Sequence, residues 1–270
     1  MNDHVTSAPA RLLARFDRVM REQARPDGPG ARAERVGDVV RLVGAAHDWN
    51  GVVWSAPDLD AARADAAIAE QVAHCERAGR EEFEWKLYGH DRPADLGARL
   101  SAAGFEAGEP ETLLVARVAE QAGRVRLPDG VRLEEVRDEA GVELMARAHE
   151  RAFGTDASRL RRQVLARLRE DPERFVALVA VAGGEPVSSA RMELHPGTGF
   201  AGLWGGGTVP AWRGRGVYRA LVARRAAVAA ERGYEHLQVD ATEDSHPILE
   251  RLGFTALTTT TPYVYHLTHR

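Results

Sequence analysis

The chain has 270 residues, of which 44% are hydrophobic and 28% charged, so it has material for one large soluble domain or two of ordinary size. Its formal net charge of −4 gives no reason to expect nucleic acid as a partner, and no apolar run approaches the roughly 18 residues of a membrane span. The single cysteine, Cys75, excludes an intramolecular disulfide and a cysteine-based zinc cluster, and the amino terminus lacks a secretory signal. We therefore expect a cytoplasmic protein with no metal site and a structural role for Cys75.

The first half of the chain alternates helical and strand patterns. A Pro/Gly loop occupies residues 25–34, and the polar stretch 119–130, with its Gly and Pro residues, is typical of a linker. The elements expected before this linker are helices over 10–24, 59–78 and 93–103 and strands over 36–43, 51–54, 82–88 and 111–118.

The second half is again a mixed α/β unit. Its expected elements are helices over 139–152, 156–170, 214–232 and 245–252 and strands over 131–137, 175–182, 186–194, 200–208, 236–241 and 256–267. Segments 95–118 and 247–267 share one plan, in which a short amphipathic helix, a Gly-Phe exit and an apolar strand follow one another. This similarity favours a tandem duplication.

The stretch "TVPAWRGRGVYRALVARRAA" (208–227) places two glycines between a strand and a helix. Pro210 cannot continue the strand, and glycine inside a helix costs roughly 0.5–1 kcal/mol relative to alanine, so Gly214 and Gly216 do not serve the helix itself. A helix start offers unpaired N–H groups and the positive end of its dipole, and Arg213 and Arg215 add charge. These residues indicate a pyrophosphate cradle. An ordinary helix start with two surface arginines fits them equally well.

The segment "VPAWRGRGVYRALV" resembles motif A of the GNAT superfamily (GCN5-related N-acetyltransferases), whose signature is Gln/Arg-x-x-Gly-x-Gly/Ala. The following "GYEHLQVDATEDSHPILERLGF" resembles the next strand, helix and Leu-Gly-Phe ending of that family. The resemblance implies that backbone amides of the loop bind the pyrophosphate of acetyl-CoA. Tyr218 replaces the last Gly/Ala of the signature, which requires its ring to point away from the phosphates. The implied cofactor-binding residues are Thr208, Val209, Arg213, Gly214, Arg215, Gly216, Val217 and Tyr218.

The resemblance also implies an α/β (α+β) architecture of tandem GNAT-like folds, each a mixed, mainly antiparallel sheet flanked by helices. Residues 131–270 are the expected acetyltransferase domain with the CoA-binding loop, and 119–130 are the linker. Residues 1–118 are the expected degenerate GNAT-like domain, which lacks a cofactor loop. Within it, Tyr88 and Asp91 lie at a strand end and turn, where they either shape the acceptor pocket or only pack.

The residues for proton transfer are harder to assign. Many GNAT members use a glutamate on the fourth strand as base and a tyrosine before Leu-Gly-Phe as acid, but here "FAGLWGGGTV" has no carboxylate and Leu249 takes the tyrosine position. Asp240 is the candidate base, and a structural hydrogen bond is the alternative role. Glu193 and His246 are weaker substitutes. The glycines 205–207 either keep side chains away from the acyl group or mark a bulge.

The implied function is an acetyl-CoA-dependent N-acetyltransferase that acts on a small-molecule amine by direct attack on the thioester. The alternative is a non-catalytic acyl-CoA-binding or regulatory GNAT-like protein, because both usual proton-transfer residues are missing. We expect no nucleic acid and no membrane as partners, and the oligomeric state, a homodimer included, is left open. A zinc-protease interpretation of "HERAF" fails because Phe153 stands where the second histidine is required.

Overall fold

The computed structural model describes residues 7–26, 30–45, 48–123 and 126–267. The chain divides into two compact units that are not continuous in sequence. The first unit contains residues 1–114, 240–247 and 255–270, and the second contains residues 115–239 and 248–254.

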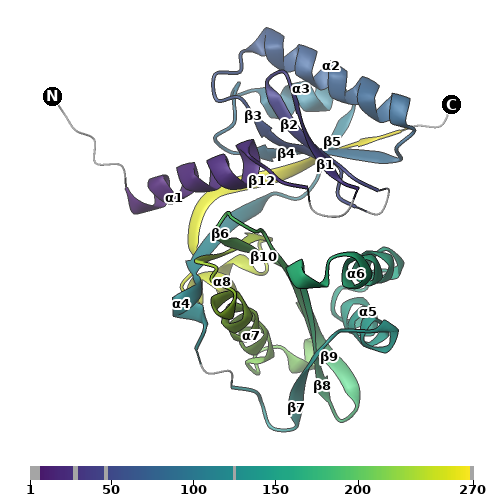
Figure 1. Ribbon diagram of the computed structural model, residues 1–270, viewed down its shortest axis with the longest axis vertical. Coiled ribbons are helices and arrows are strands. Elements are labelled where there is room, and N and C mark those ends of the chain that lie inside the picture. Colours follow the sequence, from purple (N-terminus) through teal and green to yellow (C-terminus); the bar gives the residue numbers. More distant parts are fainter. Residues whose placement is uncertain (1–6, 27–29, 46–47, 124–125, 268–270) are drawn as a thin grey trace. The chain divides into compact units, whose positions relative to one another are not determined.

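The first unit is a sheet with helices α2 and α3 packed on one face (Figure 1). Its strands follow the order β1-β2-β3-β4-β12, with β5 also paired to β12; β3 and β4 run parallel and the other pairs antiparallel. Its elements are α1 (Ala8–Phe16), the π-helical turn η1 (Asp17–Glu22), β1 (Arg32–Val36), β2 (Val39–Val43), β3 (Gly51–Ser55), α2 (Ala61–Ala78), β4 (Glu82–Tyr88), α3 (Leu96–Ala102), β5 (Phe105–Ala107) and β12 (Thr255–His266). Strand β6 (Glu111–Arg117) begins in this unit and ends in the second.

Strand β4 divides its side chains between the two faces of this sheet. Because side chains alternate along a strand, Phe83 and Trp85 enter the core beneath α2 and α3, where both are fully buried. Glu84, Lys86 and Tyr88 therefore point to the opposite face. One strand thus supplies both the apolar core and a row of polar groups.

The second unit has the strand order β11-β10-β9-β8-β7, in which only β10 and β11 run parallel among the described pairs. Its elements are α4 (Val118–Gln121), β7 (Val131–Glu135), α5 (Glu139–Phe153), α6 (Ser158–Glu170), η2 (Pro172–Arg174), β8 (Phe175–Ala182), β9 (Glu185–Leu194), β10 (Phe200–Thr208), η3 (Pro210–Trp212), α7 (Val217–Glu231), β11 (His236–Ala241) and α8 (His246–Arg251). The last two residues of β11 and the first two of α8 group with the first unit.

Helices cover both faces of the second sheet, with α5 and α6 on one side and α7 on the other (Figure 1). All eight residues of β8 are buried as a result. Ala177, Val179 and Val181 pack against α5 and α6, whereas Ala180 and Ala182 face α7. The continuous apolar run of this strand is typical of a sheet that is covered on both sides.

The predicted fold class, a mixed and mainly antiparallel sheet flanked by helices, is confirmed. The units differ from the predicted domains 1–118 and 131–270 because β12 groups with the first unit, where it pairs with β4 over seven residues. A strand pattern in the sequence does not reveal which partner the strand will find. The predicted linker 119–130 begins inside α4, and its residues 124–125 lie outside the described part of the chain.

Smaller differences between the predicted and the observed elements occur at turns of the chain. The predicted helix 10–24 continues from α1 into η1, and the predicted strand 36–43 is instead the second half of a hairpin, in which a turn at Gly37 (φ +57°) separates β1 from β2. The three residues of β5 were too few to show a pattern. The predicted Gly-Phe exits are confirmed, since Gly104 and Gly253 have φ of +93° and +92° and each is followed by a buried phenylalanine.

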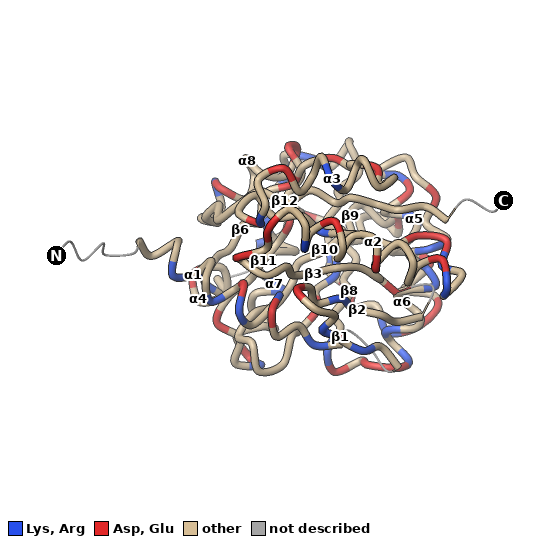
Figure 2. Tube along the Cα trace, turned by 90° about the horizontal axis from the view of Figure 1, so that it is seen from above, with Lys and Arg blue, Asp and Glu red and all other residues tan. Residues whose placement is uncertain are grey.

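Cys75 is fully buried in the core of the first unit, and burial raises the pKa of its thiol, which suits the structural role expected of it. Acidic and basic residues are interspersed along the elements of both units (Figure 2). Within the described residues, no helix combines the length and the low polarity needed to cross a bilayer.

The pairing of β12 with β4 predicts that a fragment without β4 is prone to aggregate. A fragment of residues 125–270 retains β12 but loses β4 and β5, its partners in the first unit. We expect this fragment to expose apolar surface and to aggregate, whereas the full chain stays dispersed under the same conditions. Light scattering and circular dichroism on both would measure this, and a monomeric, cooperatively unfolding fragment would contradict it.

Candidate active site

The connection from β10 to α7 is built around two glycines with left-handed backbone conformations. After β10 ends at Thr208, the short helix η3 turns the chain, and Gly214 (φ +73°) and Gly216 (φ +85°) follow. Residues with a side chain rarely adopt such φ values, whereas glycine does so without strain. Gly216 is the N-cap of α7. The sequence Gly-Arg-Gly therefore sets where the helix begins and how the chain enters it.

The backbone N–H groups at this helix start have no partner among the residues that the structure describes. The first helical hydrogen bond of α7 runs from the Ala220 N–H to the Gly216 carbonyl at 3.0 Å. None of the residues that the structure describes accepts a hydrogen bond from the N–H groups of residues 214–219. A Cβ placed on Gly214 or Gly216 would meet no atom within 4 Å, so the space beside these two glycines is open. Free amides at the positive end of a 15-residue helix form a site for an anion.

Arg213 and Arg215 have different places in this loop. The Arg213 guanidinium donates to the Thr208 carbonyl and to the Ala152 carbonyl, both at 3.1 Å, so it ties the loop to the end of β10 and to α5. The Arg215 side chain is exposed, with its guanidinium carbon 5.0 Å from the centre of the Trp212 ring. Arg213 thus holds the loop in shape, and Arg215 leaves its charge available at the open side.

Tyr218 packs against the strand rather than over the loop. A Cβ on Gly206 of β10 would lie 2.8 Å from the Cε2 atom of the Tyr218 ring, so the ring rests on the backbone of this glycine. Burial raises the pKa of the Tyr218 hydroxyl. This placement shows how the helix accommodates a tyrosine where the family signature has a small residue.

A buried arginine, Arg225, fixes α7 to the sheet beneath the loop. Its Nη1 donates to the Arg191 carbonyl of β9 at 2.9 Å, and its Nε donates to the Leu221 carbonyl at 3.1 Å. Burial lowers the pKa of Arg225 to about 10, so the side chain is still charged at neutral pH. The helix start is therefore held at a defined position relative to β9 and β10.

Strand β10 has a free edge next to the loop. Its parallel pairing with β11 is confined to residues 200–202 and 236–238, although β10 continues to Thr208. The remaining edge is open to an extended ligand that can hydrogen-bond to the main chain. Val209 is less available, because its N–H donates to the Val187 carbonyl at 2.9 Å and its carbonyl accepts from the Trp212 N–H at 2.8 Å.

The three glycines 205–207 mark a bulge and also make room for neighbouring side chains. The pairing of β10 with β9 shifts between Trp204 and Gly207, and Gly205 has φ +57°. A Cβ on Gly207 would lie 2.4 Å from the Phe153 ring, and one on Gly205 would lie 3.0 Å from the Arg191 Nη1. The bulge that the sequence raised as one alternative is therefore present, and it brings the backbone close to side chains on both faces. That the glycines leave room for an acyl group stays a prediction.

Asp240, the predicted base, is the partner of the only lysine in the chain. Lys86 Nζ forms an ion pair with Asp240 Oδ2, and the Asp240 side chain is 3% exposed. The Oδ1 atom is buried and has no hydrogen-bond partner. Burial alone would lower the pKa of Lys86, but Asp240, Tyr88 and Glu84 together outweigh it and raise that pKa. The Asp240 carboxylate therefore has a structural partner in this ion pair. Its catalytic role stays a prediction.

Two further carboxyl groups surround this ion pair in the first unit. Burial raises the pKa of Glu84, whose Oε2 accepts a hydrogen bond from Trp49 Nε1 at 2.7 Å. Burial also raises the pKa of Glu111 to about 7, with Lys86 opposing the shift and Asp240 and Glu84 adding to it. The cluster therefore contains one carboxyl group that exchanges its proton near neutral pH.

Tyr88 and Asp91 pack rather than line a pocket. The Arg21 guanidinium lies 3.7 Å from the centre of the Tyr88 ring and forms two hydrogen bonds to Asp91, at 2.7 and 2.8 Å. Leu249, at the position of the usual tyrosine acid, is fully buried.

Sequence patterns missed several residues of these sites. Glu111 was not singled out, because its raised pKa depends on neighbours that are distant in sequence. Arg191 was missed because nothing in its local sequence distinguishes it from the other arginines. Lys86 did carry a signal, since a lone lysine in a chain that otherwise uses arginine marks an unusual position.

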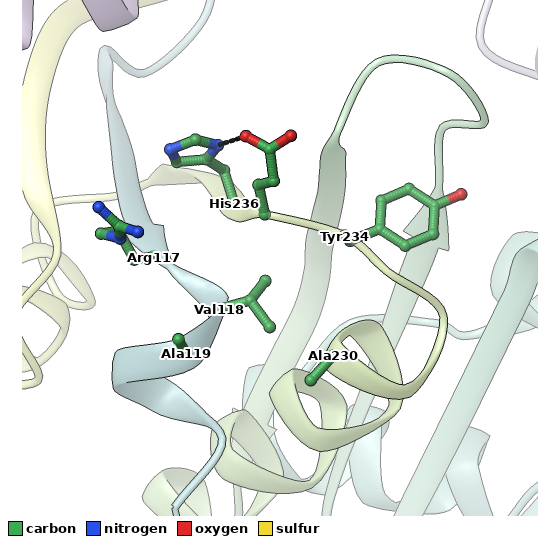
Figure 3. A pocket seen from close by; sticks show the side chains of 7 residues that line it. Arg117, Val118, Ala119, Ala230, Tyr234 and His236 are labelled. Atoms are coloured by element: carbon green, nitrogen blue, oxygen red, sulfur yellow. Dashed lines mark ion pairs between the residues drawn. The ribbon is translucent and has the colours of Figure 1, made fainter.

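A pocket of about 360 Å³ lies elsewhere in the second unit (Figure 3). It is lined by α4, the end of α7 and the start of β11, and it contains His236 and Glu235, whose Nδ1 and Oε2 atoms are 4.0 Å apart. The loop with Gly214 and Gly216 is at the other end of α7, about 20 Å away at 1.5 Å per helical residue. This pocket is therefore not part of the anion site.

Comparison with known proteins bears on the whole chain. Residues 139–254 match the acetyltransferase (GNAT) family. No curated protein sequence matches the chain. Among solved structures, the chain is similar to a GCN5-related N-acetyltransferase from Kribbella flavida, with a TM-score of 0.69, 19% identity and 98% of each chain covered. A second such enzyme, from Sphaerobacter thermophilus, gives a TM-score of 0.60 at 16% identity and covers 85% of this chain and 80% of its own.

The chain is also similar to a tandem GNAT protein from the clavulanic acid biosynthesis pathway, with a TM-score of 0.62, 14% identity, and coverage of 100% of this chain and 97% of that one. The part of the chain that carries the Gly-Arg-Gly loop thus belongs to the GNAT family, and the fold of the chain is that of GNAT proteins, a tandem member among them. This confirms the resemblance on which the sequence analysis depends.

The ion pair between Lys86 and Asp240 predicts a large loss of stability in Asp240→Asn. Removal of one partner leaves the other charge buried and unpaired, which costs about 3–5 kcal/mol in the free energy of unfolding. We expect the double variant Lys86→Met/Asp240→Asn to recover much of this loss. Urea denaturation of the unchanged chain, the single variant and the double variant measures their free energies of unfolding. A single variant whose free energy of unfolding is within about 1 kcal/mol of that of the unchanged chain would contradict the buried pair.

The raised pKa of Glu111 predicts how the free energy of unfolding depends on pH. Its carboxyl has a pKa of about 7 in the folded chain against an ordinary value of 4.5, so the folded state binds more protons than the unfolded state between these values. This group therefore makes the free energy of unfolding fall as pH rises from about 4.5 to 7. We expect Glu111→Gln to remove that decrease in denaturation measured at pH 5 and pH 8. The exposed neighbour Glu109→Gln is the control, and identical pH profiles for both variants would refute the assignment.

Proposed function

We propose that this protein is an acetyl-CoA-dependent N-acetyltransferase that acts on a small-molecule amine in the cytoplasm. The observation that carries the proposal is the start of α7 within a GNAT-family segment, where the backbone N–H groups 214–219 donate to none of the described residues and the space beside Gly214 and Gly216 is open. The pyrophosphate of acetyl-CoA fits this site because it is a bulky dianion that free amides and a helix dipole can hold together.

Each predicted cofactor residue takes a separate role in this proposal. The amides of Gly214, Arg215, Gly216 and Val217 bind the pyrophosphate, and Arg213 maintains the loop through its two carbonyl contacts. The free edge of β10 up to Thr208 holds the pantetheine arm by main-chain hydrogen bonds, which brings the thioester to the glycines of the bulge.

In the proposed reaction, the nitrogen of the neutral amine attacks the carbonyl carbon of the thioester. A C–N bond forms, the C–S bond breaks, the nitrogen gives one proton to a base, and the departing thiolate takes up one proton. The products are the N-acetyl amide and CoA with a free thiol. Holding the two reactants side by side supplies much of the rate acceleration. Asp240 is the predicted base.

The cradle assignment predicts that Arg215→Glu weakens acetyl-CoA binding. The variant places a negative charge beside the bound pyrophosphate and removes a positive one, so we expect at least a tenfold rise in Kd at low salt, measured by calorimetric titration. Because the Arg215 side chain is exposed, we expect the substitution to leave the free energy of unfolding nearly unchanged.

Arg162→Glu, on the exposed side of α6, changes the net charge of the chain by the same amount and is the control. Equal affinity of the two variants would contradict the cradle. To test turnover, free thiol is measured with a panel of amines. Tight binding of acetyl-CoA without thiol release from any amine would overturn the enzymatic part of the proposal and favour the regulatory alternative.

A further inference from the structure

Arg191, on β9, carries a charge that the protein does not neutralise. Among the described residues, none forms a hydrogen bond or an ion pair with its guanidinium; only its carbonyl is used, by Arg225. Arg191 is partly buried. The buried Arg21 and Arg41 are paired with carboxylates, whereas the buried Arg225 is held by two carbonyls. Burial lowers the pKa of Arg191, which shows that its charge is poorly solvated. An unpaired charge in such a place is costly unless an external anion joins it.

The strand register places this guanidinium on the face of the sheet that α5 and α6 cover. Arg191 is directly opposite Ala177 of β8, which packs in the core beneath those helices, and opposite Trp204 of β10. Residues that face each other across strands share one side of the sheet. Arg191 and Trp204 are therefore neighbours at the point where the pairing of β10 with β11 has ended.

The glycines of the bulge bring Arg191 and an aromatic ring to the same stretch of backbone. Arg191 Nη1 lies 3.0 Å from the Cβ position of Gly205, and the Phe153 ring lies 2.4 Å from that of Gly207. Phe153 is 49% exposed, an unusual fraction for a large apolar side chain. An exposed ring and an unpaired cation thus flank the segment that is proposed to hold the thioester.

The charges around Arg191 favour an anion rather than a cation. The charged neighbours on this face are Glu193 and Arg167, so with Arg191 there are two positive groups and one negative group. Burial and the charge of Arg191 lower the pKa of His149, and burial lowers that of His195, so both imidazoles are neutral at pH 7. Glu150, which lies near His149, is paired with Arg161 at 2.9 Å.

We propose that Arg191 binds a carboxylate group of the acceptor, so that the acceptor is an amino acid or another amine that carries a carboxylate. This inference rests on the proposed acetyltransferase function and adds the substrate class to it. The guanidinium forms paired hydrogen bonds to the carboxylate, and Phe153 and Trp204 pack along the rest of the acceptor.

The phosphates of CoA are not the anion that Arg191 binds. They are assigned to the loop after Thr208, whereas Arg191 is opposite Trp204, four residues earlier on the strand. On the partner strand, Arg191 is three residues from Ser188, which is opposite Thr208, so these backbone positions are roughly 10 Å apart. A carboxylate at Arg191 instead lies on the acceptor side of the thioester, or it belongs to the acyl group of a dicarboxylic thioester.

The test uses the full chain, acetyl-CoA and a panel of amino acids, each with its carboxamide, and measures kcat/KM from thiol release. We expect the amino acid to be preferred over its amide by roughly 10- to 100-fold, and this ratio to fall to near one in Arg191→Gln. Arg162→Gln, an exposed arginine on α6, is the matched control and keeps the ratio. A ratio near one in the unchanged chain, or an unchanged ratio in Arg191→Gln, would overturn the inference.

Two further measurements distinguish failure of the acceptor assignment from failure of the proposed function. Succinyl-CoA is compared with acetyl-CoA, and a loss confined to succinyl transfer in Arg191→Gln would assign the carboxylate to the donor and overturn the acceptor assignment. Calorimetry of the CoA-saturated chain with N-acetyl amino acids and their amides reports binding without turnover, and no preference for the carboxylate there also overturns it. Failure to bind acetyl-CoA itself, by contrast, would count against the proposed function.

Discussion

The left-handed glycines at 214 and 216 are the constraint on which the candidate site depends. They allow the chain to turn from β10 into α7 while the amides of residues 214–219 stay free of internal partners. Any other residue at these φ values would strain the turn. The adjacent Arg213 holds the loop to both β10 and α5, so the free amides are kept in place rather than left to a mobile loop. Preorganisation of this kind is what makes backbone amides effective ligands for an anion.

Strand β10, which precedes the loop, also contains a run of glycines. At 205–207 the backbone of β10 is contacted by Tyr218 from one face and by Arg191 and Phe153 from the other. A bulge with three glycines therefore has two consequences, because it interrupts the ladder with β9 and it admits an unpaired guanidinium beside the strand. The proposed cofactor binding at the loop and the proposed acceptor selection at Arg191 both depend on one continuous, glycine-rich segment of the second unit.

Local chemistry made the anion loop predictable from the sequence. Pro210, Gly214 and Gly216 specify a strand end and a helix start within a few residues, and the alternating and helical patterns on either side locate β10 and α7. Long-range pairing was not predictable in the same way. Lys86 and Asp240 meet although 154 residues separate them, and β12 pairs with a strand of the first unit because tertiary packing, rather than its own pattern, selects the partner. The role of Arg191 depends on contacts that are missing, which no sequence pattern reveals.

The most direct test of the central claim is amide hydrogen exchange of the full chain with and without acetyl-CoA, read at single-residue resolution by NMR. The proposed cradle predicts that the amides of Gly214–Val217 exchange freely in the unliganded chain and become strongly protected when acetyl-CoA is bound, because each then donates to a phosphate oxygen. Exchange at α2 in the first unit should stay unchanged. Acetyl-CoA binding that leaves these amides unprotected would contradict the account.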